Sequence, residues 1–210
     1  MSAISKEAYL KNPCQAASLP YWKEKSVNVP ESMRIVHDDA FSAALLREYI
    51  DERYFKLLHD LKTVPVASLP KEYALREATT AELAAHICSC YEGCNINEES
   101  ILCWQQRKTY KADLWLTVCE VSSGKIVASG VAELDADIGE GALEWIQVSA
   151  EHRKCGLAKF VVAELLRRMQ GKALFVTVSG KCDDPCQPQQ LYRACGFTGN
   201  SIWHVLRKME

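Results

Sequence analysis

The sequence has no long hydrophobic run, and this excludes two classes of protein. No segment approaches the roughly 20 apolar residues of a membrane-spanning helix, and residues 1–19 contain no apolar core of signal-peptide length. An excess of charge is also missing, because 25 basic and 27 acidic residues leave a formal net charge of −2. This balance gives no reason to expect a nucleic acid or a membrane as a partner. We therefore expect a soluble cytoplasmic protein.

Cysteine is abundant, with ten residues, but the residues that accompany it in a metal site are missing. Without a secretion signal, reduced thiols that pack as small hydrophobic side chains are the default. Neither of the two groups that are close in sequence has C-x-x-C repeats or histidine partners, so we expect no metal. These groups are Cys88, Cys90, Cys94 and Cys103, and the looser pair Cys182 and Cys186.

The familiar glycine-rich nucleotide loops are missing too, since neither G-x-G-x-x-G nor G-x-x-x-x-G-K-[ST] occurs. What is present instead is a strand, a short polar turn and a helix over residues 145–169. The helix has an apolar residue at every fourth position, which is typical of a face that packs on a core. This stripe consists of Leu157, Val161, Leu165 and Met169.

The turn before this helix has the features of an anion site. The first amides of a helix have no partner inside it and carry roughly half a positive charge. Arg153 and Lys154 add two full charges, and Gly156 lets the backbone approach a ligand closely. A basic, glycine-containing turn between a strand and a helix is typical of a phosphate cradle. Many turns between a strand and a helix bind no ligand. On these residues alone, an anion site and a purely structural turn are both compatible with the sequence.

Two motifs resemble those of a known family. Arg153-x-x-Gly156-x-Ala158 resembles the acetyl-CoA pyrophosphate signature, Q/R-x-x-G-x-G/A, of the GNAT superfamily of N-acetyltransferases. After a further strand, Leu191-Tyr192-Arg193-Ala194-Cys195-Gly196-Phe197 resembles the family segment L-Y-x-x-x-G-F. The resemblance covers about residues 73–207 and implies acetyl-CoA as the cosubstrate.

The resemblance also implies a fold and a division into domains. The expected fold is α+β, layered α/β/α, with a mixed and largely antiparallel central sheet. The family domain would occupy residues 71–210 and leave residues 1–70 as a partly irregular N-terminal extension. In the extension we expect a strand at 33–36, a helix at 39–49 and a linker at 64–70, while 54–61 fits a strand or a helix equally.

Within the domain, the patterns predict alternating strands and helices. Thr79-x-x-Glu82 predicts a capped helix start, and Gly93 is expected to end that helix. The resemblance adds a pair of strands at the end of the chain. The expected strands before that pair are 73–77, 114–121, 126–134, 142–148 and 174–178.

The resemblance assigns roles to particular residues. The strand that ends at Val148 would supply backbone groups to the pantetheine arm and the thioester carbonyl. Tyr192 matches the family tyrosine that lies near the sulfur as an acid, although a helix tyrosine packed on the core is the alternative. Many family members carry an asparagine at the start of the helix that holds this tyrosine. In this chain that region is Asp183-Asp184-Pro185-Cys186-Gln187-Pro188, which contains no asparagine. The expected cofactor-binding residues are Ile146, Gln147, Val148, Arg153, Lys154, Cys155, Gly156, Leu157 and Ala158.

An amine acceptor needs a base, because an aliphatic amine with a pKa near ~10 is mostly protonated at neutral pH. Glu144 lies on the strand before the cradle, and strand alternation puts it on the same face as Ile146 and Val148. Glu133 and Asp135 compete for this role. A solvated carboxylate is the alternative for all three.

These observations predict an N-acetyltransferase in which a primary amine attacks acetyl-CoA directly in a ternary complex. A ping-pong reaction through Cys155 is one alternative, because a helix N-terminus beside Arg153 and Lys154 should lower the pKa of this thiol. A non-catalytic acyl-CoA-binding sensor is another. The acceptor, a small-molecule or peptide amine, is not readable from the sequence, and a homodimer is left open.

Overall fold

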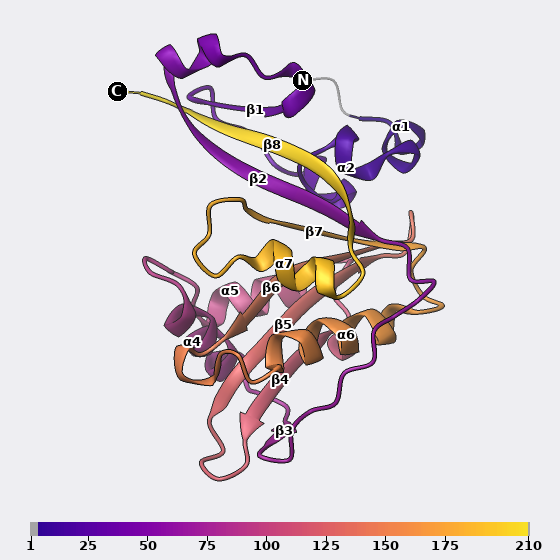
Figure 1. Cartoon of the computed structure of the whole chain (residues 1–210), viewed down its shortest axis with the longest axis vertical. Helices are drawn as coiled ribbons and strands as arrows, with labels where there is room; N and C mark the ends of the chain where they lie inside the picture. The colour runs from indigo at the N-terminus through magenta and orange to yellow at the C-terminus, as the bar shows by residue number, and fades with distance from the viewer. Residues whose placement is uncertain (1–3, 210) are drawn as a thin grey trace. The chain divides into compact units, whose positions relative to one another are not determined.

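The computed structural model of the protein describes residues 4–209, which fall into two compact units (Figure 1). The first unit combines the residues up to Asp60 with those from Thr177 onward, so it is built from both ends of the chain. The second unit is the continuous segment Leu61–Val176. The sequence-based boundary between residues 70 and 71 does not coincide with this division and stays a prediction.

The second unit consists of strands with helices packed on them. Its strand order is β7-β6-β5-β4-β3, and β7 continues into the first unit. All the strands predicted for this part of the chain are present. The elements are β3 (Tyr73–Leu75), α4 (Thr80–Cys90), α5 (Glu98–Gln105), η3 (Ala112–Leu114), β4 (Trp115–Glu120), β5 (Ile126–Asp135), β6 (Glu140–Val148), η4 (Ala150–His152), α6 (Leu157–Met169) and β7 (Phe175–Lys181).

Helix α4 begins at the predicted capping box. The Thr79 hydroxyl accepts the Glu82 N–H at 3.2 Å, and the Glu82 carboxylate accepts the Thr79 N–H at 2.8 Å. The Arg76 guanidinium, followed by the Thr79 N–H, holds the pKa of Glu82 at about 2. The helix ends at Cys90, so the prediction that Gly93 ends it was wrong by three residues. Gly93 instead has φ +68° in the turn that follows.

Helices cover both faces of the sheet in the second unit. Val131 of β5 packs in a buried cluster with Leu83 of α4 and Ile101 of α5. A Cβ at the neighbouring Gly130 would lie 2.3 Å from Val161 of α6. Because adjacent strand residues point to opposite faces, α4 and α5 lie on one face and α6 on the other. The predicted α6 stripe is buried along its length, at Leu157, Val161, Leu165 and Met169.

In the first unit, the last strand of the chain lies between two N-terminal strands. Its strand order is β1-β8-β2-β7, and β8 is antiparallel to both β1 and β2. The pair of final strands expected after the last helix was therefore wrong: one strand, β8, occurs there, and its neighbours come from the N-terminal segment. The elements are α1 (Lys6–Lys11), α2 (Pro13–Ala16), α3 (Tyr21–Glu24), β1 (Met33–His37), η1 (Asp38–Ala40), η2 (Ala43–Arg47), β2 (Tyr49–His59), α7 (Pro188–Ala194) and β8 (Thr198–Lys208).

The predicted helix at 39–49 was wrong. The segment forms the short 3-10 turns η1 and η2, which Phe41 and Ser42 separate. Tertiary contacts override the helical pattern here, because Phe41 stacks on the His204 ring with centroids 3.8 Å apart, and Asp38 contacts the same ring at 3.0 Å. The ambiguous segment 54–61 belongs largely to strand β2.

The expected α+β class with a mixed, largely antiparallel sheet is confirmed. The pairings of β1 with β8, β2 with β8, β3 with β4, β4 with β5 and β5 with β6 are all antiparallel. Within residues 4–209, no helix is both long and apolar enough to cross a membrane.

Candidate functional site

The turn between β6 and α6 has a backbone that only a few residue types adopt easily. Lys154 has φ +63° and Gly156 has φ +80°, so two left-handed residues occur within three positions. A Cβ at Gly156 would meet no atom within 4 Å, so the backbone angle and not crowding favours glycine there. Turns of this kind aim successive N–H groups toward one side, which is the arrangement of an anion-binding nest.

The amides that follow this turn are open donors. The Phe160 N–H makes the first helical hydrogen bond of α6, to the Gly156 carbonyl at 3.0 Å. Among residues 4–209 no acceptor is present for the amides of Leu157, Ala158 and Lys159, and no side chain caps the helix. Three donors at the positive end of a 13-residue helix form a site for an anion.

Two cationic side chains, Arg153 and Lys154, closely precede the open amides of α6 in the chain. Arg153 and Lys154 are both exposed, and the Arg153 Nε donates to the Val148 carbonyl at 3.3 Å. This contact holds the guanidinium between the end of β6 and the start of α6. Of the predicted cradle residues, Arg153 to Gly156 therefore lie together in one exposed, basic turn, and Leu157 and Ala158 are the first two residues of α6.

The strand residues predicted to contact the cofactor point to opposite faces of the sheet. Ile146 lies on the α6 face, where its Cδ1 is 3.2 Å from the Cβ position of Gly130. The buried Gln147 donates from its Nε2 to the Ser129 hydroxyl, so its side chain is part of the interior. Val148 is also buried. The side chains of Gln147 and Val148 are therefore inside the protein, and a contact between the backbone of this strand and a cofactor stays a prediction.

Glu144 lies at a β-bulge. Val131 pairs with Trp145, whereas the next residue of β5, Ala132, pairs with Leu143, so Glu144 is the extra residue of β6. The alternation that placed Glu144 on the face of Ile146 is interrupted at this point, and the face it occupies does not follow from parity. Bulges are frequent next to active sites because they re-aim a side chain. The half-buried Glu144 keeps its predicted role as a hypothesis.

Both competing carboxylates have structural partners. Glu133 is 1% exposed, and it accepts hydrogen bonds from Arg107 at 2.7 Å and from Thr109 at 3.2 Å. Asp135 accepts the Asp137 N–H at 3.0 Å in the turn between β5 and β6. These contacts give Glu133 and Asp135 structural roles, and the choice of base among the three carboxylates stays a prediction.

An aromatic group that sequence reasoning did not assemble lies on the α4 and α5 face. Tyr91 packs edge-on against Trp145 with centroids 5.6 Å apart, and Trp145 stacks with Trp104 at 5.7 Å and 12°. The Tyr91 hydroxyl donates to the Ile146 carbonyl at 3.4 Å. The three rings come from the end of α4, from α5 and from β6, so no local pattern connects them.

His86 is a second residue of this face that sequence reasoning missed. It is buried in α4 near the Gln147 backbone of β6, and its Nε2 has no hydrogen-bond partner among residues 4–209. Burial lowers the pKa of His86, and the Gln147 contact opposes this shift more weakly. The ring is therefore held in its neutral form beside the strand.

Cys155 and Tyr192 lie in different surroundings. Cys155 is exposed in the cradle, with its Sγ 3.6 Å from the Arg153 carbonyl. Tyr192 belongs to α7 in the first unit, where it is 6% exposed and packs near Phe55 and Phe197 at 6.1 and 5.6 Å between centroids. These contacts agree with the core alternative for Tyr192, and its catalytic role stays a prediction.

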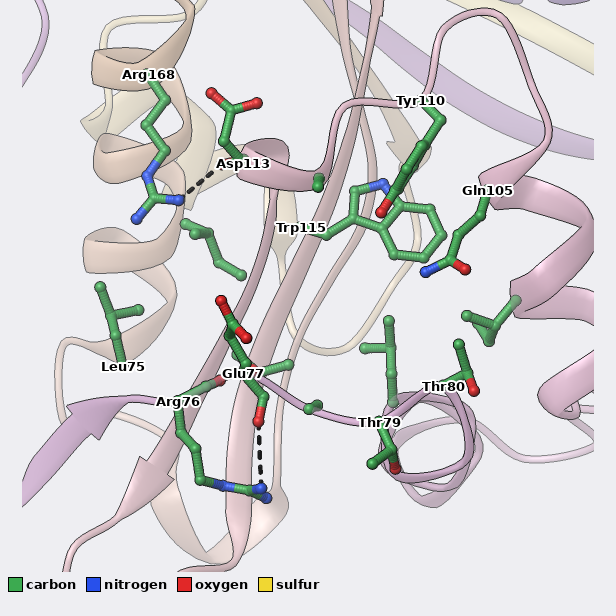
Figure 2. A pocket seen from close by; sticks show the side chains of 16 residues that line it. Leu75, Arg76, Glu77, Thr79, Thr80, Gln105, Tyr110, Asp113, Trp115 and Arg168 are labelled. Atoms are coloured by element: carbon green, nitrogen blue, oxygen red, sulfur yellow. Dashed lines mark hydrogen bonds between the residues drawn. The ribbon is translucent and has the colours of Figure 1, made fainter.

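A cavity of about 680 Å³ opens in the second unit at the edge of β4, and Figure 2 shows it. Tyr110 and Trp115 form an aromatic wall, with centroids 5.0 Å apart, opposite Thr79 and Thr80 at the start of α4 (Figure 2). None of the predicted site residues lines this cavity. The cradle and this cavity are therefore separate features. In the described part of the chain, no group of three or more His, Cys, Asp or Glu residues could hold a metal ion.

Comparison with protein families gives the class of this protein. Residues 80–197 match the model of the Acetyltransferase (GNAT) family, which is more than half of the 210 residues. The chain therefore belongs to the GNAT acetyltransferase family, and the resemblance found in the two motifs is confirmed. Membership in this family indicates acyl transfer from an acyl-CoA.

Solved structures agree on the fold. The chain is similar to a GCN5-related N-acetyltransferase from Sphaerobacter thermophilus, with TM-score 0.67 and 18% identity over 90% of this chain and 64% of that one. A GCN5-related N-acetyltransferase from Kribbella flavida gives TM-score 0.59 and 16% identity over 85% and 68%. A GNAT-family acetyltransferase from Colwellia psychrerythraea gives TM-score 0.57 and 16% identity over 84% and 64%.

These identities are low enough that the structures establish the fold alone. The chain also spans only 64% of the length of the Sphaerobacter protein. No curated protein matches the sequence significantly. The substrate must therefore be inferred from this chain's own residues.

Proposed function

We propose that this protein is an N-acetyltransferase that transfers an acetyl group from acetyl-CoA to a primary amine. The observation that carries the proposal is the start of α6, where three open amides adjoin two exposed cations at the family's signature positions. A pyrophosphate is a doubly charged anion that needs several N–H donors and a cationic neighbour. Arg153, Lys154 and the amides of Leu157 and Ala158 would hold it.

Acetyl-CoA supplies a thioester carbonyl that is open to attack by an amine. The oxygen of this carbonyl gains negative charge during attack, and an N–H donor stabilises that charge. The backbone of β6 around Ile146 is the proposed source of this donor and of the contacts to the pantetheine arm. The bulge at Glu144 supports this placement, because it interrupts the regular pairing of β6 one residue before Trp145.

Protons must move at both ends of the reaction. The acceptor amine attacks only after it loses a proton, and Glu144 is the proposed acceptor of that proton, directly or through water. The thiolate of CoA leaves more easily if an acid donates to it, and we assign this role to Tyr192. We assign the direct, ternary-complex route because neither role requires a covalent enzyme intermediate.

The exposure of Cys155 supports one competing route, in which the acetyl group passes first to its Sγ. In that reaction a new thioester forms at Cys155 while CoA leaves as the thiol, and the amine then attacks the enzyme thioester. Localisation in the cytoplasm and independence from membranes and nucleic acids are predictions that accompany either route, and a homodimer is left open.

Thiol release from acetyl-CoA tests the proposal. The full chain is incubated with acetyl-CoA and a panel of primary amines, and free thiol is followed over time. The direct route requires thiol release that depends on both substrates and survives in Cys155→Ala. An acetylated Cys155 that forms without any amine would favour the ping-pong route. Binding of acetyl-CoA with no release for any amine would contradict catalysis and leave an acyl-CoA sensor.

A further inference from the structure

Cys88 and Cys94 form a close pair of thiols. Cys88 lies in the last turn of α4, and Cys94 follows the left-handed Gly93, whose φ of +68° turns the chain back toward the helix. The two Sγ atoms are 2.7 Å apart, and both residues are free cysteines that are half-buried. The chain between them is short, so their contact is fixed by local structure.

The contact needs little change to become a covalent bond. A disulfide has an S–S length of about 2.05 Å, so the sulfurs must approach by roughly 0.6 Å. The Cys88 thiol is held in place by the Ile96 carbonyl at 3.1 Å and the Cys94 carbonyl at 3.4 Å. Its hydrogen bond to Cys94, and then burial, raise the pKa of the Cys88 thiol.

We propose that Cys88 and Cys94 are a thiol-oxidation site that forms an intrachain disulfide with a peroxide as oxidant. The peroxide oxidises the Cys94 sulfur to a sulfenic acid, its O–O bond breaks, and one water leaves. The Cys88 sulfur then attacks the Cys94 sulfur, the S–O bond breaks, and the second water leaves with the Cys88 proton. Two thiols lose two electrons in total, and one peroxide takes them up.

The exposed cysteines lack this arrangement. Cys103, Cys155 and Cys186 are exposed, so reagents reach them, but no hydrogen bond in residues 4–209 places a second thiol beside any of them. Oxidation there leads to higher oxides or to mixed disulfides and not to an internal bond. Accessible thiols and the bridging pair are therefore different sets of residues.

A disulfide between Cys88 and Cys94 would close a ring of the chain that contains Tyr91. Residues 88–94 form the closed ring, and Tyr91 within it donates to the Ile146 carbonyl and packs against Trp145. Fixing this turn restricts the contact between Tyr91 and the strand proposed to bind the thioester. This consequence rests on the proposed function, whereas the formation of the bond does not.

Peptide mapping tests the bond directly. The reduced full chain is treated with hydrogen peroxide near one equivalent, alkylated with N-ethylmaleimide and cleaved after glutamate. The sequence then gives Leu83–Glu92, with Cys88 and Cys90, and Gly93–Glu98, with Cys94. We expect these two fragments to be joined, and dithiothreitol to separate them. The melting temperature should rise on oxidation by on the order of 5 °C for so short a loop.

Cys90→Ser is the matched control, because Cys90 lies in the same fragment as Cys88. The disulfide link between the two fragments should persist in Cys90→Ser and disappear in Cys88→Ser and in Cys94→Ala. Circular dichroism should show that all three variants fold. A join that survives in Cys88→Ser, or separate fragments in the oxidised wild type, would overturn the inference.

Measurements of amine-dependent thiol release distinguish a failure of this inference from a failure of the proposed function. Amine-dependent thiol release should fall in the oxidised wild type and not in oxidised Cys88→Ser. A join without any effect on thiol release would overturn the consequence drawn for Tyr91. A reduced protein that binds acetyl-CoA but never turns it over contradicts the proposed function and leaves the disulfide intact.

Discussion

The two units differ in how far their buried polar contacts reach along the chain. In the second unit, apolar side chains of α4, α5 and α6 cover the sheet, and the cluster around Val131 is entirely hydrophobic. In the first unit, Lys56 is 1% exposed, and its Nζ lies 2.8–3.1 Å from the Tyr9 hydroxyl and from three backbone carbonyls. His204 likewise lies between Asp51 at 2.8 Å and Asp38 at 3.0 Å. Both units contain buried polar contacts. Those of the second unit, such as Gln147 with Ser129 and Arg107 with Glu133, join residues 18 and 26 positions apart. Those of the first unit join residues 37 to 166 positions apart, and so they tie distant segments together.

Replacing Lys56 tests the polar side of this comparison most strongly. Lys56→Met fills a similar volume but leaves the three carbonyls, of Pro13, Ala17 and Leu19, without their donor. We expect a loss of at least about 3 kcal/mol in the free energy of unfolding, because each buried acceptor left without a partner costs about 1–3 kcal/mol. Urea unfolding followed by circular dichroism measures it. A loss below about 1 kcal/mol would show that the ammonium is not what anchors the N-terminal segment.

The apolar side has a matched test in α6. Leu165 is fully buried, so Leu165→Ala removes packing and leaves a cavity. We expect a loss of about 2–5 kcal/mol in the free energy of unfolding. The exposed Lys159 of the same helix provides the control, since Lys159→Ala should change stability by less than about 0.5 kcal/mol. Equal losses in both variants would contradict the assignment of the buried face.

Variants of Glu144 and Glu133 distinguish a catalytic carboxylate from a structural one. Glu144→Gln should lower kcat on the order of a hundredfold, within the range of general-base loss, and leave the affinity for acetyl-CoA nearly unchanged. Glu133→Gln weakens the contact with Arg107 and should reduce stability, while kcat of the folded protein stays close to wild type. Steady-state kinetics and urea unfolding on both variants decide it. The reverse pattern would transfer the base role to Glu133.

Tyr192→Phe tests whether a core tyrosine of the first unit also acts in catalysis. The ring and its packing on Phe55 and Phe197 remain, so stability should be close to wild type. Loss of a donor to the leaving sulfur should lower kcat roughly ten- to a thousandfold and leave KM nearly unchanged. A wild-type kcat would reduce Tyr192 to a packing role.

His86 gives the smallest effect, a pH dependence of stability. Burial lowers its pKa in the folded state, whereas the unfolded chain takes up this proton below a pKa of about 6.5. The free energy of unfolding should therefore fall as pH decreases below about 6.5, by at most about 1.4 kcal/mol per pH unit. His86→Gln should flatten this part of the profile, and His152→Gln should not. Identical profiles for wild type and His86→Gln would contradict it.

The same comparison explains how far the sequence could be read. The α6 stripe, the capping box of α4 and the strands of the second unit follow local rules of spacing, and all are present. The cradle was readable because a helix start, a glycine and two cations are contiguous. The partners of β8 were not, since β1 and β2 precede it by more than 130 residues. Lys56 reads as a solvated lysine until the chain brings its acceptors around it.

Parts of the candidate site could be predicted only incompletely from the sequence. The bulge at Glu144 depends on the register between two strands, which alternation within one strand cannot reveal. The rings of Tyr91, Trp104 and Trp145 each fit their own element, and only the packing of α4 and α5 on β6 unites them. The contact between Cys88 and Cys94 depends on the left-handed turn at Gly93. Long-range packing supplied what local spacing could not.

Binding of acetyl-CoA to the start of α6 is the central claim, and thermal unfolding tests it most directly. Ligand that binds only the folded state raises the melting temperature, so acetyl-CoA should stabilise the wild type by about 2.7 kcal/mol at a concentration of 100 Kd. Arg153→Glu reverses an exposed charge in the cradle and should abolish this shift while the protein alone still folds. Lys111→Glu, an exposed charge reversal outside the cradle, should keep the shift. An undiminished shift in Arg153→Glu would contradict the cradle.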